Sequence, residues 1–493
     1  MSVAEDTRGA SQALRGMFTR DFLYLGVSVL QVLLSACVTP ILTRRVGVDG
    51  YGQLALAVAA MQIIGPLLSF GLPFATQKVF AGEDGNRRAR GVLAVSAVLT
   101  GVAWLLVLLA APVWSPAIGL NHVLDARLAA SWGACFALTW TCLAMLRSKD
   151  SLRTAIVVGA LQSLGAQALG VTLLYAWSPT LTSYLCGVTI GQAAAGLVGL
   201  VALRPEWAAV PTIRAHMGAL RFGLPMVPQQ LAVFILFAGD RIVIRHDLGS
   251  GATGRYSVAY NVGSLGVLLL VFVNQAWVPR IYSISDRVER AHLLASSRNA
   301  MNLILVPVVF GLAVAAPAVL RLWAPRSFDP SGLTLVVAVV ALSTFPYGQF
   351  LANVRALMSE GMTGRAALMT LLGATVNVVL NVAMVPAFGI TGSAIATVVS
   401  YGLLALLTTP PAKSGLEVPT IPVQLAAIVG SGAALALATS VLPTTAMWLV
   451  LRLAACAVAG VCFVFLVRTA VSNPDAFGRL VTPAEPPLPS QAP

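Results

Sequence analysis

One apolar stretch of the sequence, residues 222–244, carries two adjacent charges, Asp240 and Arg241. Ionisable groups inside a membrane span are costly, so they are rare and usually face a cavity or a partner. Asp240 is predicted to lie about four residues from the end of this span, roughly 6 Å below the interface. It could act as an H⁺ or Na⁺ site, or as a gate residue paired with Arg241, Arg44 or Arg45. We favour the gate.

Residue patterns for catalysis or metal binding are missing from the sequence. The four histidines lie in predicted loops, and none has a metal partner at helix spacing. The sequence contains no Gly-Lys-Ser loop that could cradle phosphates, which argues against ATP hydrolysis. All six cysteines lie in apolar stretches without metal-ligand spacing. We therefore expect no enzyme activity and no bound cofactor or metal, with coupling to H⁺ or Na⁺ left open.

The composition is that of an all-α membrane protein. Of 493 residues, 58% are hydrophobic and only 10% are charged, and a soluble core cannot absorb that much apolar sequence. Apolar stretches of about 20 residues, the length that crosses a bilayer, recur along the chain. Fourteen spans are predicted, at about 21–43, 53–80, 91–113, 129–146, 154–177, 183–203, 222–244, 256–280, 299–320, 332–354, 366–386, 391–410, 421–442 and 446–468.

The basic residues are distributed unequally about these spans. The formal net charge of +13 could suggest nucleic-acid binding, yet the basic residues lie in short loops between spans. With a cytoplasmic N-terminus, twenty-two of them fall on the inside, eight on the outside, and Arg452 within a span. This is the positive-inside pattern of membrane proteins. We expect both termini in the cytoplasm and no nucleic-acid partner.

A weak internal repeat divides the first twelve spans into equal halves. At a shift of 202 residues, VGVDGYGQLALA overlays LGSGATGRYSVA, with Gly47 on Gly249 and Gly52 on Gly254. Duplicated halves are common in transporters. We expect these glycine pairs to let the chain reverse tightly between two spans.

No loop is long enough to fold as a separate domain. The predicted parts are a cytoplasmic N-terminus (1–20), an N-terminal lobe of six spans (21–203), a cytoplasmic linker (204–221), a C-terminal lobe of six spans (222–410), two further spans (421–468) and a disordered cytoplasmic tail (469–493). Pro225 and Pro228 interrupt backbone hydrogen bonding in the seventh span, so we expect a kink there.

Four segments resemble the motifs of one superfamily. They are TPILTRRVGVDGYGQLALA (39–57), LRFGLPMVPQQ with DRIVIRHDLGSGATGRYSVAYNVG (within 220–263), VNQAWVPRIYS (273–283) and NVVLNVAMVPAFGITGSAIATVVSYG (377–402). The chain resembles the oligosaccharide and polysaccharide flippases, O-antigen flippases among them, of the multidrug/oligosaccharidyl-lipid/polysaccharide (MOP) superfamily. The resemblance covers nearly the whole chain.

This resemblance implies two six-helix lobes around a central cavity, and transport of polyprenyl-pyrophosphate-linked oligosaccharide by alternating access. It implies the bacterial inner membrane and the biosynthesis of a cell-surface lipopolysaccharide or exopolysaccharide. Membrane lipids are expected contacts, and a polysaccharide polymerase or other assembly proteins could be partners. Two alternatives remain open: a cation-coupled multidrug or small-molecule antiporter of the same superfamily, and a non-transporting scaffold of an assembly complex. A membrane glycan polymerase or ligase is disfavoured, because no large outer loop is predicted.

Two basic residues occupy equivalent positions in the two predicted lobes. Lys78 and Arg280 lie at the inner ends of spans two and eight. Facing each other across a cavity, they would form a cationic floor for a pyrophosphate. The alternative is that each only anchors its span at the inner membrane surface. Arg298 and Arg355 are weaker candidates of the same kind.

Polar side chains inside predicted spans form a further group of candidates. Gln229 lies eleven residues before Asp240, on nearly the same side of the helix. We expect Gln229, Asn274 and Gln275 to face the cavity and bind sugar hydroxyls. Such side chains equally often form hydrogen bonds between helices, each worth about 0.6 kcal/mol. The same alternatives apply to two pairs at i, i+4 spacing, Gln349 with Asn353 and Asn377 with Asn381.

Overall fold

The computed structural model describes residues 21–210, 217–271, 281, 284, 286–411, 416, 418–443 and 446–472, and these residues are helical without any strand. The first half of the chain forms α2 (Asp21–Ser69), α3 (Leu72–Phe80), α4 (Gly85–Leu109), α5 (Ala111–Ile118), α6 (Val123–Ser148), α7 (Leu152–Ala160), η1 (Leu161–Gly165), α8 (Ala166–Ala176) and α9 (Leu181–Leu203). The second half forms α10 (Met217–Gly223), η4 (Leu224–Met226), α11 (Val227–Ala238), α12 (Asp240–Gly263), α14 (Arg287–Trp323), α15 (Thr334–Leu342), α16 (Thr344–Ser359), α17 (Thr363–Leu407), α18 (Val423–Ser440) and α19 (Ala446–Ser472). Short 3₁₀ turns lie at η2 (Trp207–Ala209) and η5 (Arg326–Phe328).

Eleven helical segments of the described chain are long and apolar enough to cross a membrane. Three of them, of 33, 47 and 45 residues, exceed what one crossing needs. Each of these three turns at a glycine with positive φ: Gly47 (71°), Gly249 (88°) and Gly389 (60°). Counted on both sides of these turns, the described chain has fourteen crossing segments. The prediction of an all-α membrane protein with about fourteen spans is confirmed.

The turn between the first two spans is tighter than the predicted glycine-pair loop. The chain reverses at Gly47 alone, and Gly52 lies within the following helix. Gly249 and Gly254 behave in the same way. Only the first glycine of each pair needs the positive φ that other residues rarely adopt. The expectation that both glycines make the turn was wrong, and the shared geometry supports the internal repeat.

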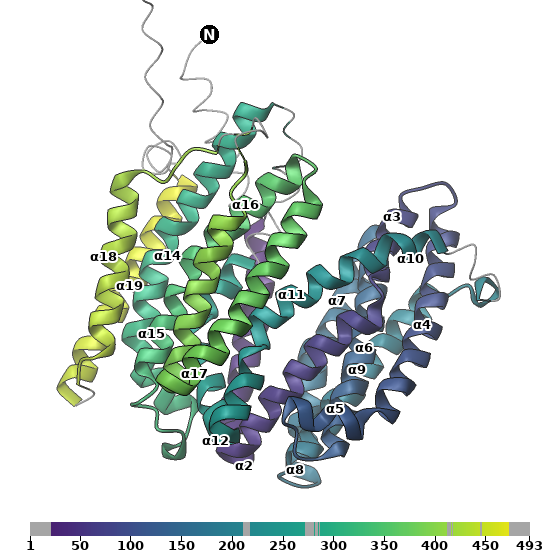
Figure 1. The fold of residues 1–493 in the computed structure, drawn as a ribbon, viewed down its shortest axis with the longest axis horizontal. Coiled ribbons are helices and arrows are strands. Elements are labelled where there is room, and N and C mark those ends of the chain that lie inside the picture. The colour runs from purple at the N-terminus through teal and green to yellow at the C-terminus, as the bar shows by residue number, and fades with distance from the viewer. Residues whose placement is uncertain are drawn as a thin grey trace, which may run out of the picture.

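The helices form two bundles, which we call the N-lobe (α2–α9) and the C-lobe (α11–α17) (Figure 1). The lobes meet where α2 and α12 turn, at the bottom of Figure 1, and diverge toward the end that carries α3 and α16. The largest apolar cluster spans both lobes at their meeting end, with Tyr51 and Leu56 from α2 and Tyr256 and Val258 from α12. Burial of this shared surface holds the lobes together.

The seventh span begins against the N-lobe and ends in the C-lobe. Its first part, α10, packs against α3, and α11 and α12 pack against α17. Between α10 and α11 lies the 3₁₀ turn η4, which contains Pro225 and is followed by Pro228. The kink expected from these two prolines is present. The span therefore crosses diagonally from one bundle to the other (Figure 1).

The last two described helices, α18 and α19, pack against α14 on the outside of the C-lobe (Figure 1). Arg452 of α19 is only 3% exposed. Its Nη2 atom donates to the carbonyl oxygens of Thr439 (2.5 Å) and Leu442 (2.8 Å), at the end of α18. The last carbonyls of a helix have no partner within the helix. Arg452 therefore adds a donor at the end of α18, where the backbone N–H of Leu442 also bonds to Thr439 O.

Candidate transport path and gate

Polar contacts join the two lobes where they meet, and we call this surface the seam. The seam includes hydrogen bonds from Thr43 Oγ1 to Trp323 O (2.5 Å), Arg44 Nη2 to Leu322 O (2.8 Å), Gln53 Nε2 to Ser250 Oγ (3.1 Å), Arg245 Nη2 to Asn121 Oδ1 (3.0 Å) and Asn261 Nδ2 to Tyr51 OH (3.1 Å). These bonds link residues that lie 124 to 280 positions apart in the sequence. The seam therefore joins the lobes at the end opposite the one where they diverge (Figure 1).

Two glycines bring the backbones of the lobes into contact at the seam. A Cβ atom on Gly52 would lie 2.0 Å from the carbonyl oxygen of Ser250, and one on Gly254 would lie 2.3 Å from that of Val48. Such distances are far below van der Waals contact, so no larger residue fits without separating the helices. The second glycine of each repeat is therefore required for packing.

Asp240 is the first residue of α12 and is only 2% exposed. The segment continues to Gly249 instead of ending at residue 244. Asp240 is therefore nine residues, or about 13 Å, from the turn. The helix therefore continues beyond the predicted span end at residue 244, and the depth of Asp240 below the interface stays a prediction.

Both carboxylate oxygens of Asp240 accept hydrogen bonds. Arg241 Nη1 donates to Oδ1 at 2.6 Å, and the Tyr256 hydroxyl donates to Oδ2 at 2.5 Å. Arg241 also donates to the carbonyl oxygen of Phe237 and lies 4.2 Å from the ring centre of Tyr260. Buried charges persist when they are paired and hydrogen-bonded in this way. The arrangement ties α12 to the end of α11.

The other arginines considered as partners of Asp240 are engaged elsewhere. Arg44 donates to Leu322 O and Pro40 O. Arg45 lies over the ring of Tyr175, 4.1 Å from its centre. Of the three candidate partners, Arg241 alone forms an ion pair with Asp240 in the part of the chain that the structure describes.

The predicted substrate residues are only partly described. Lys78 is exposed at the end of α3, and its Nζ atom lies 4.0 Å from the ring centre of Phe222 in α10. Gln229 is half-buried on α11. Lys78 and Gln229 therefore both lie along the seventh span, on the side of the seam where the lobes diverge. The remaining predicted residues, Arg280, Asn274 and Gln275, lie outside the described residues.

Two weaker basic candidates are buried instead of facing an open space. Arg298 is 5% exposed, and its guanidinium donates to Asn299 Oδ1 and to the carbonyl oxygen of Pro419. It thereby fastens α14 to the segment before α18. Arg355 is 6% exposed within α16.

The two predicted amide pairs of the C-lobe form bonds within and between helices. These bonds run from Gln349 Nε2 to Asn353 Oδ1 (2.8 Å), Asn353 Nδ2 to Ala405 O (2.7 Å), Asn377 Nδ2 to Ser400 Oγ (3.2 Å) and Ser393 Oγ to Asn381 Oδ1 (2.6 Å). Of the two roles left open by the sequence, the structure assigns these residues to helix packing.

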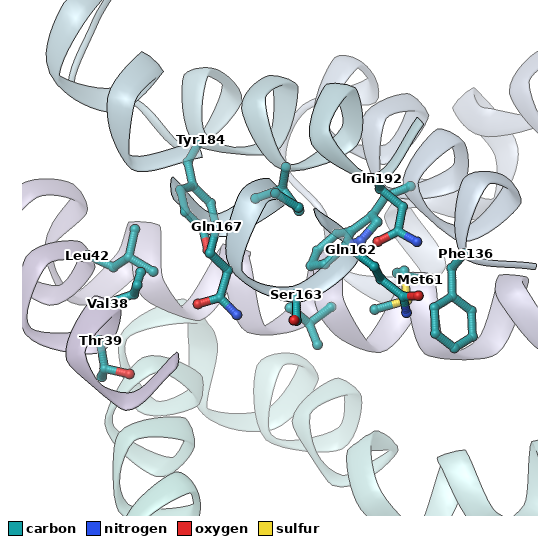
Figure 2. Close-up of a pocket in the computed structure, with 14 residues that line it drawn as sticks. Val38, Thr39, Leu42, Met61, Phe136, Gln162, Ser163, Gln167, Tyr184 and Gln192 are labelled. Atoms are coloured by element: carbon teal, nitrogen blue, oxygen red, sulfur yellow. The ribbon is translucent and has the colours of Figure 1, made fainter. Parts of the chain in front are cut away.

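The N-lobe contains a pocket that the sequence analysis did not single out. It has a volume of about 320 Å³ and lies between α2, α6, α9 and the η1–α8 segment (Figure 2). Three glutamines line it: Gln162, Gln167 and Gln192. A sequence signal for it exists, since these are polar residues within spans five and six. Which way they face could not be deduced, because η1 is a π-helical turn that shifts the helical register.

Two helical bundles joined by a seam, with a seventh span running between them, define the architecture of a two-lobed membrane transporter. The structure of "Lipid II flippase MurJ, inward closed conformation" is similar, with a TM-score of 0.69 and 14% identity over 92% of this chain and all of that chain. An inward-facing multidrug resistance MATE family transporter of the MOP superfamily is also similar, with a TM-score of 0.63 and 16% identity over 81% of this chain and 96% of that chain. These likenesses show the fold.

The sequence identifies the family. The model of the family described as "Polysaccharide biosynthesis protein" matches residues 18–285, more than half of the chain, so the protein belongs to this family. A similar relative is the "Probable flippase AglR" of Haloferax volcanii, 23% identical over 399 residues that cover 78% of this chain and 81% of the relative. The predicted membership of the MOP superfamily flippases is confirmed.

Proposed function

We propose that this protein is a flippase that moves a polyprenyl-pyrophosphate-linked oligosaccharide across the bacterial inner membrane by alternating access. The family, the flippase relative and the MurJ-like fold support this proposal. The observation that carries it is the seam, because hydrogen bonds join the lobes at one end while the lobes diverge at the other.

The distribution of basic residues supports an orientation for this state. Twenty-two of the thirty-one basic residues fall on the side expected to be cytoplasmic, together with both termini. In that orientation the seam faces outward, and Lys78 lies at the open, cytoplasmic end. The pyrophosphate would bind Lys78 together with Arg280, and the lipid tail would remain in the bilayer. Gln229, Asn274 and Gln275 would contact the sugars.

We assign Asp240 and Arg241 to the gate. Opening the seam to the outside requires the seventh and eighth spans to move away from α2. The Asp240–Arg241 pair and its bond to Tyr256 would keep these spans together as one body during that motion. An antiporter of cations needs a carboxylate that can exchange its partner for a proton or an ion. The engagement of both Asp240 oxygens favours the flippase over that alternative.

The test combines depletion with substitution. Depletion of the protein should lower the amount of lipid-linked glycan in the outer leaflet and cause its precursor to accumulate. Mass spectrometry measures the precursor, and digestion by a non-permeant glycosidase measures the glycan in the outer leaflet. Replacing Lys78 by Gln should lower this transport about tenfold or more, because a charge-assisted bond to phosphate is lost, while Lys78→Arg should retain it. The control is Arg365→Gln, an exposed basic residue of α17 with no proposed ligand. Normal outer-leaflet glycan after depletion would refute the proposal.

A further inference from the structure

All the residues that line the pocket of the N-lobe belong to that lobe. The pocket lies within one bundle, is partly open, and has the size of a small-ligand site, which starts at about 300 Å³. Its wall combines aromatic side chains, Trp132, Phe136 and Tyr184, with the amides of Gln162 and Gln192. No charged residue is among those that line it. An ion would therefore be left without a countercharge, so the lining fits a neutral ligand.

Two amide atoms of this pocket lack a hydrogen-bond partner within the described structure. They are the Oε1 atom of Gln162, an acceptor, and the Nε2 atom of Gln192, a donor. Gln192 is only 1% exposed, and a buried polar group without a partner is unfavourable. Figure 2 shows both side chains extending into the same part of the pocket, Gln162 from η1 and Gln192 from α9.

The backbone supports a binding role for this place. Gln162 and Ser163 lie in η1, a π-helical turn of five residues that separates α7 from α8. Such turns are uncommon and often occur at functional sites, because they re-aim side chains out of the regular helical pattern. Here the turn directs Gln162 and Ser163 into the pocket (Figure 2).

We propose that this pocket binds one uncharged sugar residue of the transported glycan. A sugar hydroxyl can donate to Gln162 Oε1 and accept from Gln192 Nε2, while the apolar face of the ring packs on the aromatic wall. The inference rests on the proposed function for the source of the sugar. The N-lobe would thereby hold the glycan while the pyrophosphate remains between the lobes.

The experiment uses the full-length protein in lipid nanodiscs and free methyl glycosides of glucose, galactose and N-acetylglucosamine as probes. Saturation-transfer NMR titrations should show that at least one probe binds. Gln192→Leu and Gln162→Leu should each raise its Kd about tenfold, because one hydrogen bond is lost and a ligand hydroxyl is left unpaired. The matched control is Gln62→Leu, which removes a half-buried N-lobe amide that does not line the pocket.

Thermal unfolding separates binding from folding. Because Gln192 Nε2 has no partner to lose, Gln192→Leu should unfold at the same or a higher temperature than the unsubstituted protein. No probe binding, or equal binding to the unsubstituted protein and both pocket variants, would overturn the inference. If the protein transports the glycan but binds no sugar probe, the proposed sugar site is refuted and the proposed flippase function stands. If sugar binding depends on Gln162 and Gln192 but no lipid-linked glycan is transported, the proposed flippase function is refuted and the sugar site stands.

Discussion

The two lobes use buried amide side chains in different ways. In the C-lobe, Asn353, Asn377 and Asn381 bond to groups on their own or neighbouring helices. In the N-lobe, Gln162 and Gln192 each present an unpaired amide atom to a pocket. Gln349 Oε1 of the C-lobe is also unpaired, but it is not among the residues that line the pocket. Two unpaired amide atoms beside one pocket distinguish the N-lobe, and because a buried amide without a partner is costly, they favour a ligand there.

This difference arises from side chains on two similar backbones. Gly47 and Gly249 turn the chain with nearly the same dihedral angles, 202 residues apart. The lobes therefore share a framework at the seam and differ in what fills their interiors. Three C-lobe asparagines bond within their lobe, whereas two N-lobe glutamines line a pocket.

The largest effect on stability is expected from the C-lobe ion pair. Arg241→Met leaves the buried Asp240 carboxylate without its countercharge, which should lower the free energy of unfolding by roughly 3–5 kcal/mol. Chemical unfolding in detergent measures this change. The double variant Asp240→Asn/Arg241→Met removes both charges and should be less destabilised than the single one. Equal stability of all three proteins would show that the pair contributes nothing to this lobe.

An intermediate and symmetric effect is expected at the seam. Gly52→Val and Gly254→Val each place a side chain against the backbone of the other lobe, which should cost about 1–3 kcal/mol. Unfolding measurements on both variants test whether the two repeats contribute equally. Gly101→Val serves as the control, because a Cβ there meets nothing within 4 Å. A large effect at one seam glycine and none at the other would contradict the shared framework.

The smallest effect tests the contrast between the lobes directly. Asn381→Val removes the acceptor of Ser393 and should lower stability by about 0.6 kcal/mol, with roughly 1.7 kcal/mol as an upper value. Gln192→Leu should not lower it, since no protein partner is lost. Both are measured by thermal unfolding in the same lipid. If the N-lobe variant is the less stable of the two, the proposed difference between the lobes is wrong.

The features that repeat along the chain could be predicted from the sequence. The lengths of the apolar stretches predict the fourteen crossings, and Pro225 and Pro228 predict the break in the seventh span at η4. The end of the helix that carries Asp240 could not be predicted, because the polar residues Arg245, His246 and Asp247 precede its turn at Gly249.

The remaining features depend on contacts between distant segments. The N-lobe pocket needs α2, α6, α8 and α9 to assemble around Gln162 and Gln192, and a π-helical turn to direct Gln162 inward. The bond between Asn261 and Tyr51 joins residues 210 positions apart. Neither follows from local periodicity, because it depends on how the helices are rotated about their axes.

Arg452 has a consequence for how the protein is made. An isolated arginine is expensive to place in a bilayer, and Arg452 bonds to the carbonyl oxygens of Thr439, at the end of α18, and of Leu442, just beyond it. Because α19 leaves the ribosome after α18, Arg452 finds these acceptors only with α18 beside it. We expect the insertion machinery to receive the two helices as one hairpin, and a chain interrupted between them to be recognised as unassembled and degraded.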